Sequence, residues 1–212
     1  TKGQGNNMFR KVCIIFQLII SIGIIFCSII MVKQLHYLRN TDIGIERKNI
    51  ASISIYPYSE KYKQTLTQMP EVTDILTEHG SLLPYRSRIS YHIEDWSDKK
   101  ENDQPISLEV VCGTESLAQF YNLTLLKGEM IHDSDLSGQV LINETAAKAF
   151  GWNDPIGKSI IQPKDVYQVK GLIKDTYNAS PTTPVNPTLY LSPEKYKQLF
   201  YNSPQDIIFK YK

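Results

Sequence analysis

The sequence predicts an α+β protein with one N-terminal transmembrane helix and stalk, followed by a mixed domain outside the lipid. Three observations lead to this fold class. Residues 12–32 contain no Asp, Glu, Lys or Arg, residues 50–79 follow a strand–helix–strand pattern, and residues 89–212 hold mostly short alternating segments. The length that follows the apolar run suits one domain or two small lobes.

The charge-free run 12–32 predicts a membrane-spanning helix. Its 21 residues reach about 31 Å at about 1.5 Å per residue, roughly the hydrocarbon thickness of a bilayer. Arg10 and Lys11 precede it, and Lys33 and Arg39 follow it. A buried core helix rarely runs this far without a charge, and signal peptides and re-entrant segments have shorter apolar cores.

Three polar side chains interrupt the predicted span, namely Gln17, Ser21 and Ser28. Each can bond across to another helix, and a serine can also bond back to its own turn. The alternative, in which a single helix simply tolerates these groups, is equally consistent with the sequence. The positive charges on both sides of the span do not decide its orientation.

The helix is expected to continue past the lipid as a stalk over residues 33–40, because this stretch contains no helix breaker. Asn40, Asp42 and Gly44 are expected to end it. The stalk and its connection to the next element together occupy residues 33–44.

The first elements after the stalk form a β-α-β unit. Residues 50–55 alternate and predict a strand, and residues 72–79 predict a second one. Between them, Ser59 is expected to cap a short helix that Pro70 stops.

A hairpin is expected next, with strands over 89–93 and 108–112 joined by the polar loop 95–105. Thr114 is expected to cap a short helix, and residues 140–142 predict a strand.

Asn143 is expected to cap the helix 144–150, and Gly151 suits the left-handed position after that helix. Residues 154–157 fit a type I turn with Pro155 second and Gly157 fourth.

The last third of the chain predicts a strand over 167–173 and an extended proline-rich segment over 178–187. A helix that begins after Ser192 and a final strand through Ile207, Phe209 and Tyr211 complete the expected elements.

Composition excludes several classes of function. A net charge of +1 gives no reason to expect nucleic acid as a partner. Cys13 and Cys27 lie in the predicted span, so Cys112 stands alone outside it, and neither a disulfide framework nor a zinc site is predicted. The four histidines have no ligand spacing, so no metal site or resident cofactor is expected.

No catalytic motif is predicted. The segment 151–159 superficially resembles a phosphate-binding loop, but five residues rather than four separate its first glycine from Gly157-Lys158-Ser159. A helix precedes the segment instead of following it. A helix end and a turn explain both glycines, so the chain is expected to be non-enzymatic.

Six segments, in this order and spacing, resemble the FtsX-like, MacB-type ABC transporter permeases, in particular those of Bacteroidetes-type bacteria. They are residues 10–17, 34–44, 126–130, 140–146, 154–158 and 169–175. Together they cover nearly the whole chain, from about residue 9 to the end. Each segment is weak alone, but six in this order are fairly specific.

The resemblance implies a MacB-like periplasmic core domain with two lobes. It implies a cytoplasmic segment 1–11, the span 12–32, the stalk 33–44, an α/β lobe over 45–126 and a β-rich lobe with a return strand over 127–212. This domain would be the second of its kind in a longer permease, with further spans after Lys212. The chain begins without Met and ends inside a predicted strand, which also suggests an excised piece.

The resemblance also implies partners and a location. The permease would sit in the bacterial inner membrane, form a homodimer or paired permease, and be driven by a separate cytoplasmic ATPase that binds the ATP. A periplasmic or outer-membrane partner is a further expectation. The span and stalk would transmit motion to the domain, with Gln17, Ser21, Ser28, Lys33, Arg39, Asn143, Gly151, Pro155 and Gly157 as mechanical or structural residues.

Two other readings remain open on the sequence. A single-pass sensor with an extracytoplasmic ligand-binding domain would share the span, the stalk and the mixed domain. A membrane-anchored hydrolase would need a catalytic motif that the sequence does not present.

Overall fold

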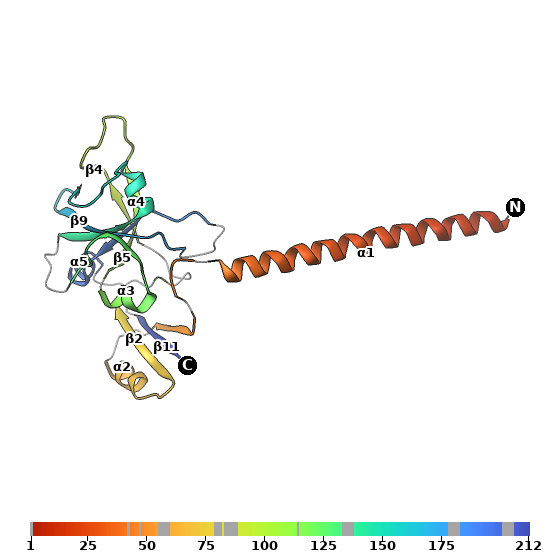
Figure 1. Ribbon diagram of the computed structural model, residues 1–212, viewed down its shortest axis with the longest axis horizontal. Coiled ribbons are helices and arrows are strands. Elements are labelled where there is room, and N and C mark those ends of the chain that lie inside the picture. The colour runs from red at the N-terminus through yellow and green to blue at the C-terminus, as the bar shows by residue number, and fades with distance from the viewer. Residues whose placement is uncertain are drawn as a thin grey trace. The chain divides into compact units, whose positions relative to one another are not determined.

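The computed structural model describes residues 2–41, 43–46, 48–54, 60–78, 82, 89–113, 115–132, 138–177, 183–200 and 206–212. It contains two compact units, residues 1–42 and residues 43–212. The first unit is a single helix, and the second contains two β-sheets with short helices (Figure 1).

The first unit consists of α1 (Lys2–Asn40), one unbroken helix of 39 residues. Its side chains from Met8 onward are almost all exposed, including the isoleucines of the run 12–32. The helix closes with a backbone bond from Thr41 N–H to the Tyr37 carbonyl at 2.9 Å. Residues 33–40 are therefore helical, as expected, whereas Asp42 lies outside the described residues.

The second unit contains every strand and four short helices of the described chain. In order they are β1 (Ile50–Ser54), α2 (Glu60–Thr67), β2 (Val72–Glu78), β3 (Ile89–Ile93), β4 (Asp95–Trp96), β5 (Ile106–Cys112), α3 (Glu115–Tyr121), β6 (Leu125–Gly128), β7 (Gln139–Asn143), α4 (Glu144–Ala149), β8 (Ser159–Ile161), β9 (Val166–Ile173), β10 (Thr188–Leu191), α5 (Pro193–Leu199) and β11 (Asp206–Tyr211).

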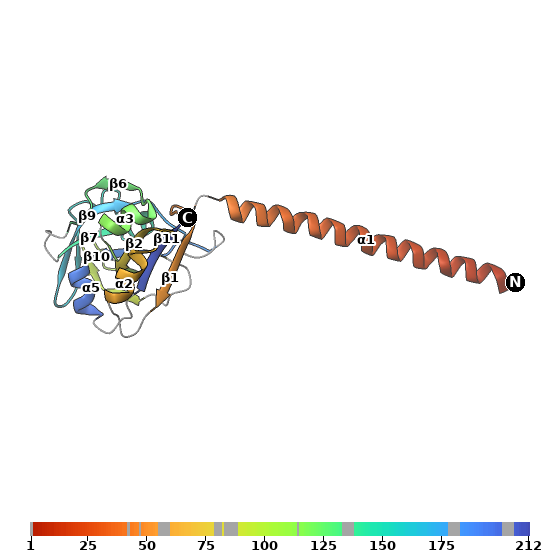
Figure 2. The same ribbon diagram turned by 90° about the horizontal axis from the view of Figure 1, so that it is seen from below.

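The smaller sheet has the strand order β1-β11-β2, and both pairings are antiparallel (Figure 2). The opening strand–helix–strand unit is confirmed, but its two strands are not neighbours, because β11 lies between them. Ile53 opposes Ile207 and Phe209 opposes Ile75, which places these four side chains on one face of the sheet.

The larger sheet has the order β3-β5-β10-β7-β9-β8-β4, with β6 paired to β9. Only Glu94 separates β3 from β4 in the chain, yet these strands stand at opposite ends of the order. Residues 89–96 therefore form one extended segment that pairs with β5 at one end and with β8 at the other. The sheet consequently closes on itself like a small barrel.

Two apolar cores use opposite faces of the large sheet. One contains Leu108, Val110, Val140 and Ile142, and it also takes in Phe150 after α4 and residues of α4 and α5. The other contains the alternate side chains, and these pack with α3 and the small sheet: Val111, Leu141, Tyr190, Ile173, Leu117, Phe120, Leu76 and Ile208. Because side chains alternate along a strand, the large sheet supplies both cores.

The other predicted elements are confirmed with boundary shifts of one or two residues, including the hairpin β3–β5 and the helices that precede and follow it. Four short strands were not predicted: β4, β6, β8 and β10. The proposed caps Ser59 and Thr114, and residues 178–182 of the proline-rich segment, lie outside the described residues.

The predicted type I turn over 154–157 is wrong by one residue. Lys158 N–H donates to the Pro155 carbonyl at 3.1 Å, so the turn runs from Pro155 to Lys158. Gly157 takes the third position with φ +79°, a feature of type II turns. Gly157 N–H also donates to the Val169 carbonyl at 2.8 Å, which ties the turn to β9.

Candidate functional site

Two parts of the molecule are candidates for function: the long helix α1, and the ring of segments around β9 in the large sheet. Within the described residues, Met8–Asn40 is the one helix whose length and composition would allow it to cross a membrane.

Five of the predicted mechanical residues lie on α1: Gln17, Ser21, Ser28, Lys33 and Arg39. The Ser28 hydroxyl donates to the Ile24 carbonyl at 2.8 Å, so this serine bonds back to its own turn. Lys33 and Arg39 lie in the two turns that follow the apolar run, and the last turn carries Arg39, where a cation is favoured.

The end of the stalk carries its own polar contacts. The Asn40 side-chain nitrogen lies 2.5 Å from His36 Nδ1, and the Thr41 hydroxyl donates to the Tyr37 carbonyl at 2.7 Å. These bonds hold the last turn and the first residue after it.

Asn143 joins three segments, which is more than the helix cap predicted from the sequence. Its side-chain oxygen accepts from Ala146 N–H and from Thr188 N–H, each at 2.9 Å. Its side-chain nitrogen donates to the Asn186 carbonyl at 3.0 Å. The Asn143 side chain is buried, and its two bonds from backbone N–H groups are made away from solvent.

A second polar cluster lies beside this cap and was not predicted. Asp175, after the end of β9, accepts from Thr145 N–H at 2.9 Å and from the Thr145 hydroxyl at 2.7 Å. In return, the Glu144 carboxylate accepts from Asp175 N–H at 3.0 Å. The first turn of α4 is thereby fixed to the end of β9. The one indication of this contact in the sequence is that the two segments that contain these residues, 140–146 and 169–175, both belong to the family resemblance.

Four of the six resemblance segments meet at β9. β7 pairs with β9 in parallel, β6 pairs with it in antiparallel fashion, and the turn after Pro155 bonds to Val169. Gly128 opposes Gly171 across the β6–β9 pair, and a Cβ on Gly128 would meet the Lys170 carbonyl. These four segments therefore form a framework of backbone hydrogen bonds around β9.

Gly151 and Pro155 take structural positions within this framework. Gly151 follows α4 with φ +72°, as its predicted left-handed position requires. Pro155 is buried. Between α4 and Pro155, the Trp152 ring stacks on the Phe150 ring, with the ring centroids 4.4 Å apart.

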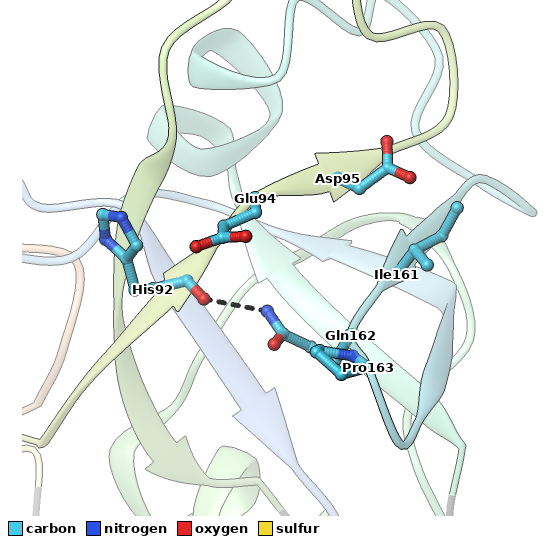
Figure 3. A pocket seen from close by; sticks show the side chains of 6 residues that line it. All are labelled: His92, Glu94, Asp95, Ile161, Gln162 and Pro163. Carbon is cyan, nitrogen blue, oxygen red and sulfur yellow. Dashed lines mark hydrogen bonds between the residues drawn. The ribbon is translucent and has the colours of Figure 1, made fainter.

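The seam that closes the large sheet contains an open cavity of about 350 Å³ (Figure 3). It is lined by His92, Glu94, Asp95, Ile161, Gln162 and Pro163. The β4–β8 pairing covers only two residue pairs, so the strands separate beyond Asp95. There the Gln162 side chain donates to the His92 carbonyl at 2.9 Å, in place of a ladder bond. The two carboxylates are exposed, which gives the cavity an acidic rim.

A partly buried ion pair lies beside β9, on the side of α5. Lys195 Nζ lies 2.6 Å from Asp165 Oδ1, and the Tyr167 hydroxyl lies 3.4 Å from the other carboxylate oxygen. Burial, together with the neighbouring Tyr91 and Asp165, raises the pKa of Tyr167 well above its ordinary value. Burial likewise raises the pKa of Tyr196 to about 12. Both phenols therefore stay neutral and serve packing.

The described side chains include no group of three His, Cys, Asp or Glu residues that could hold a metal ion. Cys112 is buried in the core that the large sheet forms with α4 and α5.

Comparisons with known proteins assign a family to this chain. The model of the MacB-like periplasmic core domain matches residues 14–212. A search of curated proteins found no match. The family assignment rests on the match over residues 14–212.

Solved structures that are similar to this chain include one extracellular and one periplasmic domain. The extracellular domain of the noncanonic ABC-type transporter YknZ from Gram-positive bacteria is 17% identical, with a TM-score of 0.48 over 76% of this chain and 74% of that one. The periplasmic region of MacB from Actinobacillus actinomycetemcomitans is 16% identical, with a TM-score of 0.49 over 82% of this chain and 79% of that one.

Proposed function

Because the chain belongs to the family of MacB-like periplasmic core domains of ABC transporter permeases, we propose that it transmits ATP-driven motion across a membrane. In this proposal α1 spans the bacterial inner membrane, and residues 43–212 lie in the periplasm. A separate cytoplasmic ATPase binds the ATP, and the permease works as a homodimer or paired permease. The motion exports a substrate or regulates a periplasmic or outer-membrane partner.

The observation that supports this proposal best is the continuity of α1. One helix runs from Lys2 to Asn40 without a break, so the apolar run and the stalk form a single rod. A rigid helix carries displacement along its length, whereas a flexible linker absorbs it. Gln17, Ser21 and Ser28 would contact other helices in the lipid, and Lys33 and Arg39 would mark the surface of the lipid.

The framework around β9 would receive this motion as one body. Asn143 and Asp175 tie α4 to β9 and β10 through buried or half-buried hydrogen bonds. Gly151, Pro155 and Gly157 would keep the turn after α4 in register with β9. We also propose the division of the domain into lobes 45–126 and 127–212, with motion between them.

Stalk replacement tests the proposal. The protein is purified with its ATPase, reconstituted in lipid, and labelled in the domain for distance measurement by pulsed electron spin resonance. Residues 34–38 are replaced either by Gly and Ser or, as a matched control, by a helix-forming sequence of Ala, Glu and Lys. We expect ATP to change the distance distribution in the native and helical variants and not in the Gly/Ser variant. A full response in the Gly/Ser variant would contradict rod-like transmission.

The ATPase partner is tested first by purification from the native membrane in mild detergent, with mass spectrometry of the proteins that copurify. We expect a stoichiometric ATPase with a phosphate-binding loop. A kinase in its place would contradict the permease assignment and favour a sensor.

A further inference from the structure

We infer that the open edge of β3 is a docking site for an extended, basic segment of a partner protein, which adds to the large sheet as one more strand. The site lies in the seam where β3 and β4 face the hairpin of β8 and β9, beside the cavity shown in Figure 3. Because peptide binding here does not require that α1 transmits motion, this docking site stands or falls separately from the proposed function.

The closure of the large sheet leaves part of the seam without strand pairing. β8 has three residues, and its pairing with β4 ends at Asp95 opposite Ile161. The hairpin then turns back, because Gln162 and Asp165 exchange backbone hydrogen bonds of 2.8 and 3.2 Å. Pro163 lies in this turn and has no N–H to donate. Among the described strands, β3 pairs with β5 alone, so its second edge has no described strand beside it.

Backbone groups of β3 point toward this second edge. The His92 carbonyl accepts from the Gln162 side chain at 2.9 Å across the seam, so it faces away from β5. Glu109, which opposes Ser90, donates its N–H to the Pro187 carbonyl on the other side of β5. In an antiparallel pair, opposed residues that do not bond to each other direct both backbone groups outward. Ser90 and His92 therefore present N–H and C=O groups to an added strand.

The side chains along β3 specify the pattern of the partner segment. Ser90 and His92 are exposed, whereas Ile89 and Tyr91 are half-buried and pack against the core. Side chains of an added strand follow the same alternation, with one set beside the exposed residues and the other beside Ile89 and Tyr91. The segment that fits therefore alternates polar with apolar residues.

Charge favours basic residues at the polar positions of that segment. Glu94 and Asp95 line the cavity, both are exposed, and within the described residues neither carboxylate has an ion pair. Lys99 donates to the Glu94 backbone carbonyl rather than to a carboxylate. Asp165, by contrast, already pairs with Lys195. Lys or Arg side chains on an added strand would complement the two carboxylates.

Fluorescent peptides test the edge on the full chain purified in detergent, without ATP or an ATPase. The probe is fluorescein-Lys-Val-Lys-Val-Lys-amide. One control replaces Val by Pro, which keeps the charge but removes N–H groups that a strand needs, and a second control replaces Lys by Glu. By fluorescence anisotropy we expect the probe to bind about tenfold more tightly than either control. Equal binding of the probe and the Pro control, or no binding, would overturn the inference.

A proline variant tests the backbone contact. His92→Pro removes one N–H from the β3 edge, and His92→Ala, the matched control, keeps it. Pro is tolerated on an edge strand where the N–H faces outward, so the unfolding transition followed by tryptophan fluorescence should be alike in the two variants. We expect His92→Pro to bind the probe about two- to tenfold more weakly than His92→Ala. Equal affinities would contradict strand addition.

A charge variant tests the preference for a basic segment without altering the backbone. Glu94→Gln should weaken binding of the probe about two- to fivefold, the effect of one exposed ion pair. Glu101→Gln, an exposed carboxylate that does not line the cavity, is the control and should leave binding unchanged. An unchanged affinity in Glu94→Gln would contradict the basic specificity.

Photocrosslinking in the native membrane identifies the natural occupant. p-Benzoylphenylalanine replaces Ser90, and the crosslinked peptides are sequenced by mass spectrometry. We expect an adduct with another protein, through a segment that contains Lys or Arg, and we expect it to be lost in His92→Pro and kept in His92→Ala. An adduct within the same chain, an adduct with a second copy, or no adduct would overturn the inference.

Discussion

The same residue type takes opposite positions in the two units of this protein. Isoleucines of α1 such as Ile15 and Ile19 are 58% and 61% exposed, whereas Ile93 and Ile142 in the large sheet are fully buried. In residues 43–212, removal from water stabilises the fold, and in α1 the expected solvent is itself apolar. Burial of a side chain therefore indicates a stabilising contribution in the domain, whose solvent is water. It does not do so in α1, whose expected solvent is apolar.

Removing a core side chain should give the largest effect. Phe150 packs against Trp96 and Trp152, with ring centroids 5.4 and 4.4 Å away. Phe150→Ala should lower the free energy of unfolding of the domain by about 3–5 kcal/mol. Chemical denaturation followed by tryptophan fluorescence measures this loss. Ile22→Ala, on exposed α1, is the control and should leave the same transition unchanged. A loss of similar size in the control would remove the contrast between the units.

A charge introduced in the middle of α1 should impair membrane insertion and leave the stability of the domain unchanged. Ile22→Arg should disfavour insertion of the helix into a bilayer by about 2.5–3.5 kcal/mol. Glycosylation mapping in microsomes measures insertion. The unfolding transition of the domain should not move, since Ile22 is 59% exposed. Efficient insertion of the variant would contradict a membrane-spanning α1.

Replacing one polar residue in each unit gives a further contrast between the domain and α1. Asn143→Ala removes the acceptor of two backbone N–H groups inside the domain. It should cost about 2 kcal/mol of unfolding free energy, because both donors lose a partner in a buried place. Ser28→Ala removes only a bond to the helix's own turn and should change neither domain stability nor insertion measurably. Denaturation and insertion assays on both variants check this; an unchanged transition in Asn143→Ala would refute its linking role.

Glycine substitutions should give the smallest effects, with opposite signs. Gly151 has φ +72°, so Gly151→Ala should destabilise the domain by about 1 kcal/mol although space for the methyl group is open. Gly23 has open space and no positive φ, so Gly23→Ala should favour the helix by about 0.5–1 kcal/mol. Thermal unfolding of the domain and circular dichroism of α1 in detergent measure the two changes. Equal signs would show that Gly151 is not held in the left-handed region.

Local patterns were predicted well because their causes lie within a few residues. The end of α1 at Asn40 and the cap at Asn143 both follow from neighbouring residue types. The positive φ of Gly151 follows in the same way.

Long-range features escaped prediction. Asn143 also bonds to Thr188, which is 45 residues away. The closure of the large sheet depends on pairings of β4 and β8, strands of two and three residues. A strand this short carries too little periodicity to be seen in sequence. The place of Asp175 beside Thr145 likewise arises only when β7 and β9 pair.

The position of β11 between β1 and β2 has a consequence for how the chain folds. β2 ends at Glu78 and β11 begins at Asp206, which leaves 127 residues between them. During synthesis the two outer strands emerge from the ribosome long before the strand that joins them. Closing so long a loop carries an entropic cost, so we expect the small sheet to form late and the large sheet to form without it. Until then the edges of β1 and β2 stay open, a period in which a chaperone would protect them.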